Sequence, residues 1–338
     1  MLPLPNDPRD VAEADFPRDG TPADRLRFLL NYAVLAPSLL NSQPWRFVVE
    51  ADAVRLYADR RRQLRVLDPE GRALTVSCGA ALFHLRVAAR HFGYAPAVEV
   101  LPAPEEPDLL ATVALSGPHA PGEADRRLFR AIALRHTNRL PFAATPVPPE
   151  DTAALVAAAR AEGVRLAVLD TDDARAAVAA LVEEGIRVEG ADPAVVEEIG
   201  RWLRPEGDPR RDGVPDAAQA AWDRRTTVRT PAAYLAAHTR ALLEASPAIL
   251  VLATDADAPA AWLAAGQALA HVLLVAADRG LFASYANQPV EVARLRPALT
   301  ALAGGGFPQV VFRVGYPERR EGTPRRPVAD VLEMPGAT

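Results

Sequence analysis

The sequence predicts an α+β fold, and three observations lead to this prediction. Segments with helical spacing of apolar residues alternate with short, mostly isolated strand-like runs. The 338 residues, of which 49% are hydrophobic, can form two lobes or one large fold with a sizeable core. A weak internal repeat relates two long apolar helices. We therefore expect two similar halves, residues 1–120 and 121–338, with a seam in the Pro- and Gly-containing stretch 117–122.

The first half is expected to contain two helices and four strands. Thr21 and Pro22 begin a helix, because a hydroxyl group caps the first turn and proline fits into it. Pro37 ends the apolar stripe of this helix. The second helix, 77–92, is strongly apolar and is followed by a glycine. The expected strands begin at Phe47 and Val54, pass near Val98 and span 110–115.

The second half is expected to contain three helices and three strands. The predicted helices are 123–134, 149–161 and 259–279, and the last two end at Gly163 and Gly280. The predicted strands are 164–169, 248–253 and 309–314.

The internal repeat consists of six residues that recur at a single offset of 187 positions. They are Gly79, Ala81, Leu82, His84, Ala89 and Gly93, matched by Gly266, Ala268, Leu269, His271, Ala276 and Gly280. Such a repeat predicts two halves about a pseudo-two-fold axis, like a dimer on one chain. The alternative is two similar buried helices without duplication. Measured against the repeat, the second half has about 68 extra residues, placed at about 185–245, which we interpret as a lid-like insertion.

Composition excludes several classes of protein. The net charge of −5 is unfavourable for general nucleic-acid binding, so any basic site must be local. The first twenty residues lack the apolar run of a signal peptide, and the apolar segment 258–277 is interrupted by polar residues and reads as a buried helix. The single cysteine, Cys78, and the absence of metal-ligand spacing predict neither disulfides nor a metal. We expect a cytoplasmic protein that binds no membrane.

Residues 36–45 form a polar loop after the first helix. Pro37 and Pro44 restrict the backbone, while Ser38, Asn41 and Gln43 bring hydrogen-bonding groups together. Such a loop can bind the edge of a flat heteroaromatic ring. An ordinary capped turn before a strand is the alternative.

Residues 135–139 set two arginines around a hydroxyl group after a helix. Arg135 and Arg139 each carry five N–H donors, which suit a phosphate group, and Thr137 lies between them. Arg325 and Arg326 form a third basic point between prolines near the carboxyl terminus. Solvated surface loops are the alternative for both segments.

Together these segments resemble the FMN-dependent nitroreductase superfamily. The loop matches the family pattern Pro-Ser, two variable residues, Asn, one variable residue, then Gln-Pro-Trp. The second segment resembles the family's Arg-Arg-Ser-x-Arg, and the third its carboxyl-terminal basic pair. The resemblance implies mixed, mainly antiparallel sheets surrounded by helices. It assigns ten residues to FMN: Ser38, Leu39, Asn41 and Gln43 at the ring and ribityl edge, and Arg135, His136, Thr137, Arg139, Arg325 and Arg326 at the phosphate and ribityl chain.

The chain departs from the usual family pattern in the order of its segments. A usual chain carries the Arg segment first and the loop second, and it dimerises to form two sites. Here the first half carries only the loop and the second half only the Arg segment. The order, together with the arginine-rich stretch 201–215 in the insertion, resembles the single-chain pseudo-dimers of the Acg branch. The resemblance implies a lid over the flavin, and Trp202 is the residue we expect nearest the ring.

Three functions are compatible with these patterns. The first is an NAD(P)H-dependent reductase of nitroaromatics, quinones or enones, in which hydride transfer takes place at flavin N5 and no side chain is nominated as catalytic. The second is an FMN store whose lid blocks the flavin face. The third is a flavin-free pseudo-dimer that acts in protein interaction.

The segment order predicts the flavin stoichiometry. Each half holds only one of the two binding segments, so the chain should bind a single FMN. Titration of the flavin-free protein with FMN, followed by flavin fluorescence, measures this number. Saturation at two equivalents would show that the degenerate site also binds.

Overall fold

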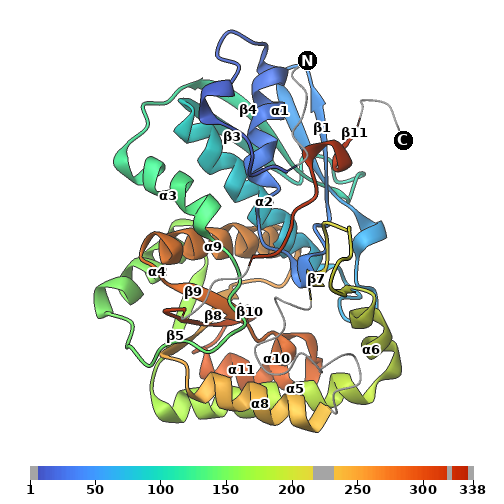
Figure 1. Ribbon diagram of the computed structural model, residues 1–338, viewed down its shortest axis with the longest axis vertical. Helices are drawn as coiled ribbons and strands as arrows, with labels where there is room; N and C mark the ends of the chain where they lie inside the picture. The colour runs from blue at the N-terminus through green and yellow to red at the C-terminus, as the bar shows by residue number, and fades with distance from the viewer. Residues whose placement is uncertain (1–6, 216–231, 318–321, 334–338) are drawn as a thin grey trace.

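A computed structural model describes residues 7–215, 232–317 and 322–333 of the chain. Within these residues two sheets lie at opposite sides of a central pair of helices (Figure 1). The α+β class and the mainly antiparallel sheets predicted from the sequence are confirmed.

The first sheet has five strands in the order β11-β1-β2-β4-β3. Its members are β1 (Trp45–Glu50), β2 (Ala53–Ala58), β3 (Tyr94–Val100), β4 (Leu109–Pro118) and β11 (Leu332–Glu333). All its pairings are antiparallel except that of β11, which runs parallel to β1 with Leu332 opposite Phe47. The carboxyl-terminal segment therefore returns to the first sheet.

The second sheet has four strands in the order β5-β8-β10-β9. They are β5 (Arg165–Leu169), β8 (Ala248–Thr254), β9 (Phe282–Tyr285) and β10 (Phe307–Gly315), all paired antiparallel. Every residue of β8 is buried because helices cover both faces of this sheet. Leu250 and Leu252 face one apolar cluster, and Ile249 and Val251 face another.

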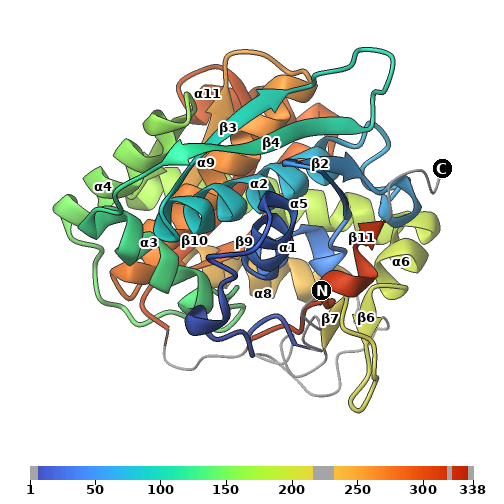
Figure 2. The ribbon, with the colours of Figure 1, turned by 90° about the horizontal axis from the view of Figure 1, so that it is seen from above.

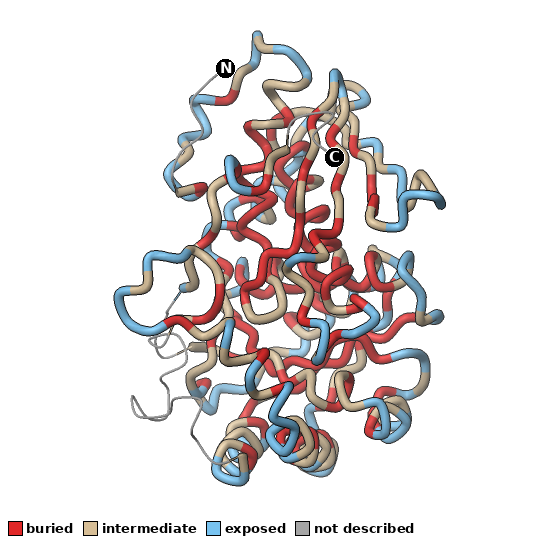
Figure 3. Tube along the Cα trace, turned by 90° about the vertical axis from the view of Figure 1, so that its right-hand side faces the viewer, coloured by how far each residue is buried: buried red, intermediate tan, exposed pale blue. Residues whose placement is uncertain are grey.

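The helices form layers around these sheets. They are α1 (Pro22–Ala33), α2 (Arg72–His91), α3 (Glu123–Leu134), α4 (Pro149–Ala161), α5 (Asp172–Ala191), α6 (Pro193–Gly200), α8 (Ala232–Glu244), α9 (Pro259–Asp278), α10 (Gln288–Glu291) and α11 (Arg296–Leu302). Short 3₁₀ turns are η1 (Glu13–Asp15), η2 (Leu39–Asn41), η3 (Arg60–Arg62), η4 (Ala293–Leu295) and η5 (Val328–Asp330). Helix α1 begins as predicted, since Thr21 and Asp24 form a capping box. Figure 3 shows the buried residues concentrated along the middle of the molecule.

Helices α2 and α9 cross at the centre, and both are members of the sequence repeat (Figure 1). A Cβ atom on Gly79 would lie 3.0 Å from the Cα of Gly266 and would overlap the Leu263 carbonyl. A Cβ atom on Gly266 would lie 2.8 Å from the Cα of Gly79 and would overlap the Val76 carbonyl. The two matched glycines thus face each other where the backbones approach most closely. Helix α9 is long and apolar enough to cross a membrane by composition, but 67% of that window is buried inside this fold.

The predicted insertion, 185–245, does not coincide with one structural unit. Its beginning lies inside α5, which the sequence analysis missed together with α6, β9, α10, α11 and β11. Helix α8 packs against α5 and shares an apolar cluster with the second sheet through Ala236 and Leu243. The remaining described part, 201–215, contains the short parallel pair β6 (Leu203–Arg204) and β7 (Val214–Pro215). Trp222, Arg224, Arg225 and Arg229 lie outside the described residues.

The glycine crossing leads to a stability prediction. Gly79→Ala or Gly266→Ala should lower the free energy of unfolding by about 1–3 kcal/mol, because the new methyl group has no space beside the opposing carbonyl. Gly322→Ala is the control, since nothing lies within 4 Å of its Cβ position. Denaturant melts of the three variants measure the effect. Equal midpoints in all three would show that the helices can separate without cost.

Candidate functional site

The loop after α1 has a constrained backbone. Leu40, Asn41 and Gln43 all adopt positive φ angles, of 45°, 54° and 49°. Each such conformation costs a non-glycine residue roughly 1–3 kcal/mol, so surrounding contacts must hold it. The backbone N–H of Gln43 donates to Ser38 Oγ at 2.9 Å, and the backbone N–H of Leu39 donates to Ser77 Oγ at 3.3 Å. The loop is thus fixed to itself and to α2.

The two amide side chains of the loop join segments that are distant in the sequence. Asn41 Nδ2 donates to the carbonyls of Gly213 at 2.9 Å and Pro324 at 3.1 Å, and its Oδ1 accepts from Arg325 at 3.0 Å. Gln43 Nε2 donates to the Arg211 carbonyl at 2.8 Å, and its Oε1 accepts from the Arg326 N–H at 2.8 Å. We call these seven residues the clasp.

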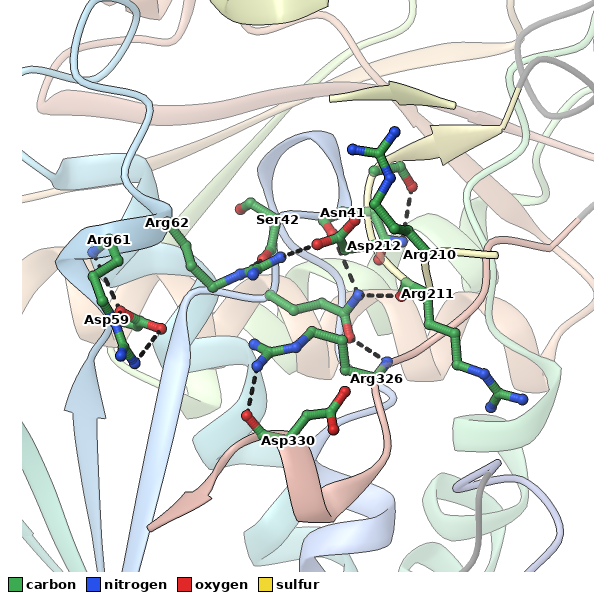
Figure 4. A network of polar contacts seen from close by, with 12 residues as sticks. Asn41, Ser42, Asp59, Arg61, Arg62, Arg210, Arg211, Asp212, Arg326 and Asp330 are labelled. Carbon is green, nitrogen blue, oxygen red and sulfur yellow. Dashed lines mark hydrogen bonds and ion pairs between the residues drawn. The ribbon is translucent and has the colours of Figure 1, made fainter. Parts of the chain in front are cut away.

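Charged side chains reinforce the clasp (Figure 4). Arg62 pairs with Asp212 and donates from Nε to the Ser42 carbonyl at 2.5 Å. Asp212 also pairs with Arg204 at 2.6 Å, and the two arginines help to hold its pKa below the usual range despite burial. Segment 201–215, which carries β6 and β7 (Figure 2), is therefore held by polar contacts to the loop after α1 and to Arg62.

Trp202 does not lie where we expected it. Its ring packs against the guanidinium groups of Arg62 at 5.1 Å and Arg204 at 5.8 Å. Leu203, the next residue, lines the large cavity described below, whereas Trp202 does not.

A cavity of about 650 Å³ lies between the two halves, within the size range of cofactor and ligand sites. Six of the predicted residues line it: Ser38, Leu39, Asn41, Thr137, Arg139 and Arg325. Apolar side chains of α5, α6 and α8 form much of the remaining wall, including Ile186, Ile199 and Leu243. The structure thus brings together the loop, the Arg segment and the carboxyl-terminal basic point.

Three arginines form the basic part of this cavity: Arg139, Arg313 and Arg325. Arg325 is 3% exposed and is held by the Ala36 carbonyl and by Asn41. Arg313 donates to the carbonyls of Leu140 at 2.9 Å and Arg139 at 3.2 Å. The acceptors in these hydrogen bonds are uncharged. No carboxylate pairs with the three arginines among the described residues.

Burial makes these positive charges costly. It lowers the pKa of Arg139 and of Arg313 to about 10, and it lowers the pKa of Arg325 well below the ordinary value, with nearby Arg135 adding to this shift. Arg139 Nη1 and the Tyr285 hydroxyl group are shielded from solvent and have no hydrogen-bond partner among the described residues. An anion in the cavity would satisfy both groups and offset the desolvation.

Four predicted residues do not line the large cavity. Arg135 is buried behind it and donates to the Leu35 carbonyl at 3.2 Å. The Nδ1 atom of His136 lies 3.0 Å from the backbone carbonyl oxygen of Leu134, and its ring packs on Phe282. Gln43 belongs to the clasp, because its side-chain amide is hydrogen-bonded to the backbone of Arg211 and to the backbone of Arg326.

Arg326 points away from its neighbour Arg325. It donates to the Asp330 carbonyl at 2.5 Å and lines a separate surface pocket of about 380 Å³ with Arg210 and Arg211 (Figure 4). The two arginines diverge because adjacent side chains of an extended backbone face opposite directions.

Sequence reasoning missed Arg313 and Tyr285. Arg313 interrupts the apolar run of β10, and a charged residue in a buried strand was an available signal. Tyr285 lies at the end of β9, a strand that was not predicted, so no pattern marked it. Among the described residues no group of three potential metal-binding side chains occurs.

Comparison with known proteins identifies the class. The model of the nitroreductase family matches residues 132–316. Two relatives come from Mycobacterium tuberculosis (strain ATCC 25618 / H37Rv). "Putative NAD(P)H nitroreductase Rv3131" is 34% identical over 93% of this chain and 92% of its own, and "Putative NAD(P)H nitroreductase acg" is 33% identical over 92% and 96%. The chain belongs to the nitroreductase family.

Solved structures give weaker similarity. A Bacteroides fragilis nitroreductase with bound FMN has a TM-score of 0.37 and 15% identity, covering 58% of this chain and 93% of its own. NfrA2 from B. megaterium has a TM-score of 0.40 and 13% identity, covering 63% of this chain and 75% of its own. The family assignment rests on the closer sequence relatives.

The divergence of Arg325 and Arg326, together with the buried and unpaired Nη1 donor of Arg139, leads to a binding prediction. Arg139→Ala should weaken FMN binding roughly ten- to hundredfold, because a charge-assisted hydrogen bond contributes about 1.5–3 kcal/mol. Riboflavin, which lacks the phosphate, should be affected much less. Arg326→Ala is the matched control and should change neither affinity, since its side chain lies outside the cavity. Fluorescence titration measures both ligands, and a larger effect in the control would reverse the assignment.

Proposed function

We propose that the large cavity holds FMN and that the protein is an NAD(P)H-dependent reductase. The single observation that carries the proposal is the set of buried arginines beside unsatisfied donors in a cavity with apolar side chains on its α5, α6 and α8 walls. One terminal phosphate would satisfy these donors, and the apolar walls suit a tricyclic ring. The names of the mycobacterial relatives support pyridine-nucleotide-dependent reduction.

The residues that would hold FMN follow from their positions. Arg139, Arg313 and Arg325 would bind the phosphate, with Thr137 beside them. Ser38, Leu39 and Asn41 would lie along the ring and ribityl edge, on a loop that the clasp keeps rigid. Arg135 would add positive potential from behind without direct contact. When bound, the flavin supplies hydride chemistry at its N5, and the protein contributes position and electrostatics.

The walls contributed by α5, α6, 201–215 and α8 would act as the lid. They would exclude water from the flavin face and shape the space for nitroaromatics, quinones or enones. The clasp would anchor this lid to the phosphate-binding segments, since Asn41 and Arg325 belong to both.

FMN storage is the second candidate function. The observation that favours it is the clasp, which ties 211–213 to the loop by several hydrogen bonds. A lid held in this way would protect bound flavin from donors. Reduction and storage share the same binding residues and differ in whether a donor reaches the flavin.

We also propose that the chain is a pseudo-dimer of two nitroreductase-like halves in a cytoplasmic protein. The contact between the matched glycines supports a pseudo-two-fold axis through the crossing of α2 and α9. The return of β11 to the first sheet would then be an exchange of the carboxyl-terminal segment between the halves.

Anaerobic stopped-flow absorbance tests the reductase against the store. Flavin-loaded protein mixed with NADH or NADPH should lose its flavin absorbance rapidly if a donor reaches N5. Dithionite reduction is the control for an intact flavin. Normal bleaching by dithionite without bleaching by either nucleotide would reject the reductase and leave storage.

A further inference from the structure

The wall of the large cavity carries a second charged group, formed by carboxyl side chains. Glu189 of α5 and Glu291 of α10 both line the cavity, and the two helices that carry them pack against each other. Burial and the neighbouring carboxyl group raise the pKa of Glu189, and burial raises that of Glu291, so the pair is expected to hold a proton. No ion pair links them to the arginines of the same cavity among the described residues. The cavity therefore presents two separate recognition surfaces.

Hydrogen-bond acceptors without partners surround this carboxyl pair. Glu189 Oε1, Gln288 Oε1 and Gln309 Oε1 are shielded from solvent and accept no hydrogen bond within the described parts of the chain, although all three residues line the cavity. Gln309 is only 3% exposed, so water does not readily compensate its oxygen. An unsatisfied buried acceptor costs roughly 1–3 kcal/mol, so this wall is incomplete without donors.

The orientation of Gln309 is fixed by its other contacts. Its Nε2 donates to Thr254 Oγ1 at 2.9 Å and to Asp257 Oδ1 at 3.1 Å, and Asp257 is itself an acceptor. The amide oxygen must therefore be the atom without a partner. Arg72 does not supply the missing donors, since its guanidinium group donates to the backbone carbonyls of Gln309 and Val290.

We propose that Glu189, Glu291 and Gln309 form a subsite for a cationic nitrogen group, such as an amidinium or a protonated amine, on the ligand that occupies this cavity beside the flavin. The several N–H donors of such a group match the acceptors that lack partners. Its single positive charge replaces that of the proton held by the carboxyl pair. The preferred substrate class is therefore a planar acceptor that bears a basic substituent. This proposal rests on the assignment of the arginine part of the cavity to FMN.

A metal ion fits the site less well than an organic cation. Calcium and magnesium require six or more oxygen ligands, and the described residues supply two carboxyl groups here. Apolar side chains, among them Ile186 and Leu243, also line the cavity, which suits the hydrocarbon part of an organic ligand.

Binding of the cation should release the proton that the carboxyl pair holds. Burial raises the pKa of Glu189 to about 9 and that of Glu291 to about 7, and the neighbouring carboxyl group raises that of Glu189 further. Arg72 lowers the pKa of Glu291 and Asp68 raises it. Because the cation binds the deprotonated pair, its affinity should increase as the pH rises through this range. At acidic pH the protonated, neutral pair should bind it weakly.

Isothermal titration calorimetry of the flavin-loaded protein with benzamidine tests the proposal. Benzamide is the matched neutral probe. Wild-type protein should bind benzamidine at least roughly tenfold more tightly than benzamide at pH 8, in line with a charge-assisted contact. Titrations in two buffers of different ionisation enthalpy should show proton release. Equal affinities, no proton release, or binding of Ca²⁺ in place of benzamidine would overturn the proposal.

Variants separate this subsite from flavin binding. Glu189→Gln and Glu291→Gln keep the side-chain volume and should abolish the preference for benzamidine while flavin content stays unchanged. Glu184→Gln, at an exposed ion pair on the same helix, should behave like wild type. A preference that survives in the double variant rejects the subsite. Absence of FMN from wild-type protein rejects the proposed function instead, and the benzamidine titration is then read on the flavin-free protein.

Discussion

Helices α2 and α9 cross at the centre of the molecule, and a glycine stands on each side of their contact. Without a side chain at Gly79 and Gly266, the two backbones approach closely enough for both helices to share one core. The first sheet packs on one side of this pair and the second sheet on the other (Figure 1). The distance between the sheets, and hence the width of the cavity between the halves, depends on this crossing.

The cavity combines segments that only the closed fold brings together. Asn41 has a dual position, because it lines the cavity and also binds backbone groups of 213 and 324. The loop that carries it adopts three left-handed conformations, which the clasp stabilises. Local backbone strain and long-range hydrogen bonds therefore support each other, and a ligand that fixes any of the three segments also fixes the other two.

The charged groups of the cavity make stability and binding interdependent. Arg139, Arg313 and Arg325 lie in a desolvated environment with neutral hydrogen-bond partners, which is unfavourable for the free protein. An anion that neutralises them stabilises the folded state in proportion to its affinity. The carboxyl pair of Glu189 and Glu291 lies in the same cavity, and burial raises the pKa of both groups, so their negative charge likewise lacks a compensating partner. Separation of the two groups within one cavity allows two chemically different ligand parts to be recognised at once.

Local patterns in the sequence determined the elements, and tertiary contacts determined their roles. The cap at Thr21, the stops at Gly163 and Gly280, and the apolar stripes were readable because they depend on neighbouring residues. The motif of residues 37–45 and the Arg segment likewise gave the family, which the relatives confirm. The sequence could not show that the Gln43 side chain belongs to the clasp or that the Arg326 side chain lines a surface pocket. It also could not show that Arg313 and Tyr285 line the cavity. It also missed α5, α6 and β11, whose burial depends on surfaces supplied by distant parts of the chain. Side-chain direction and partner choice are set by packing between segments up to several hundred residues apart, and no local pattern records them.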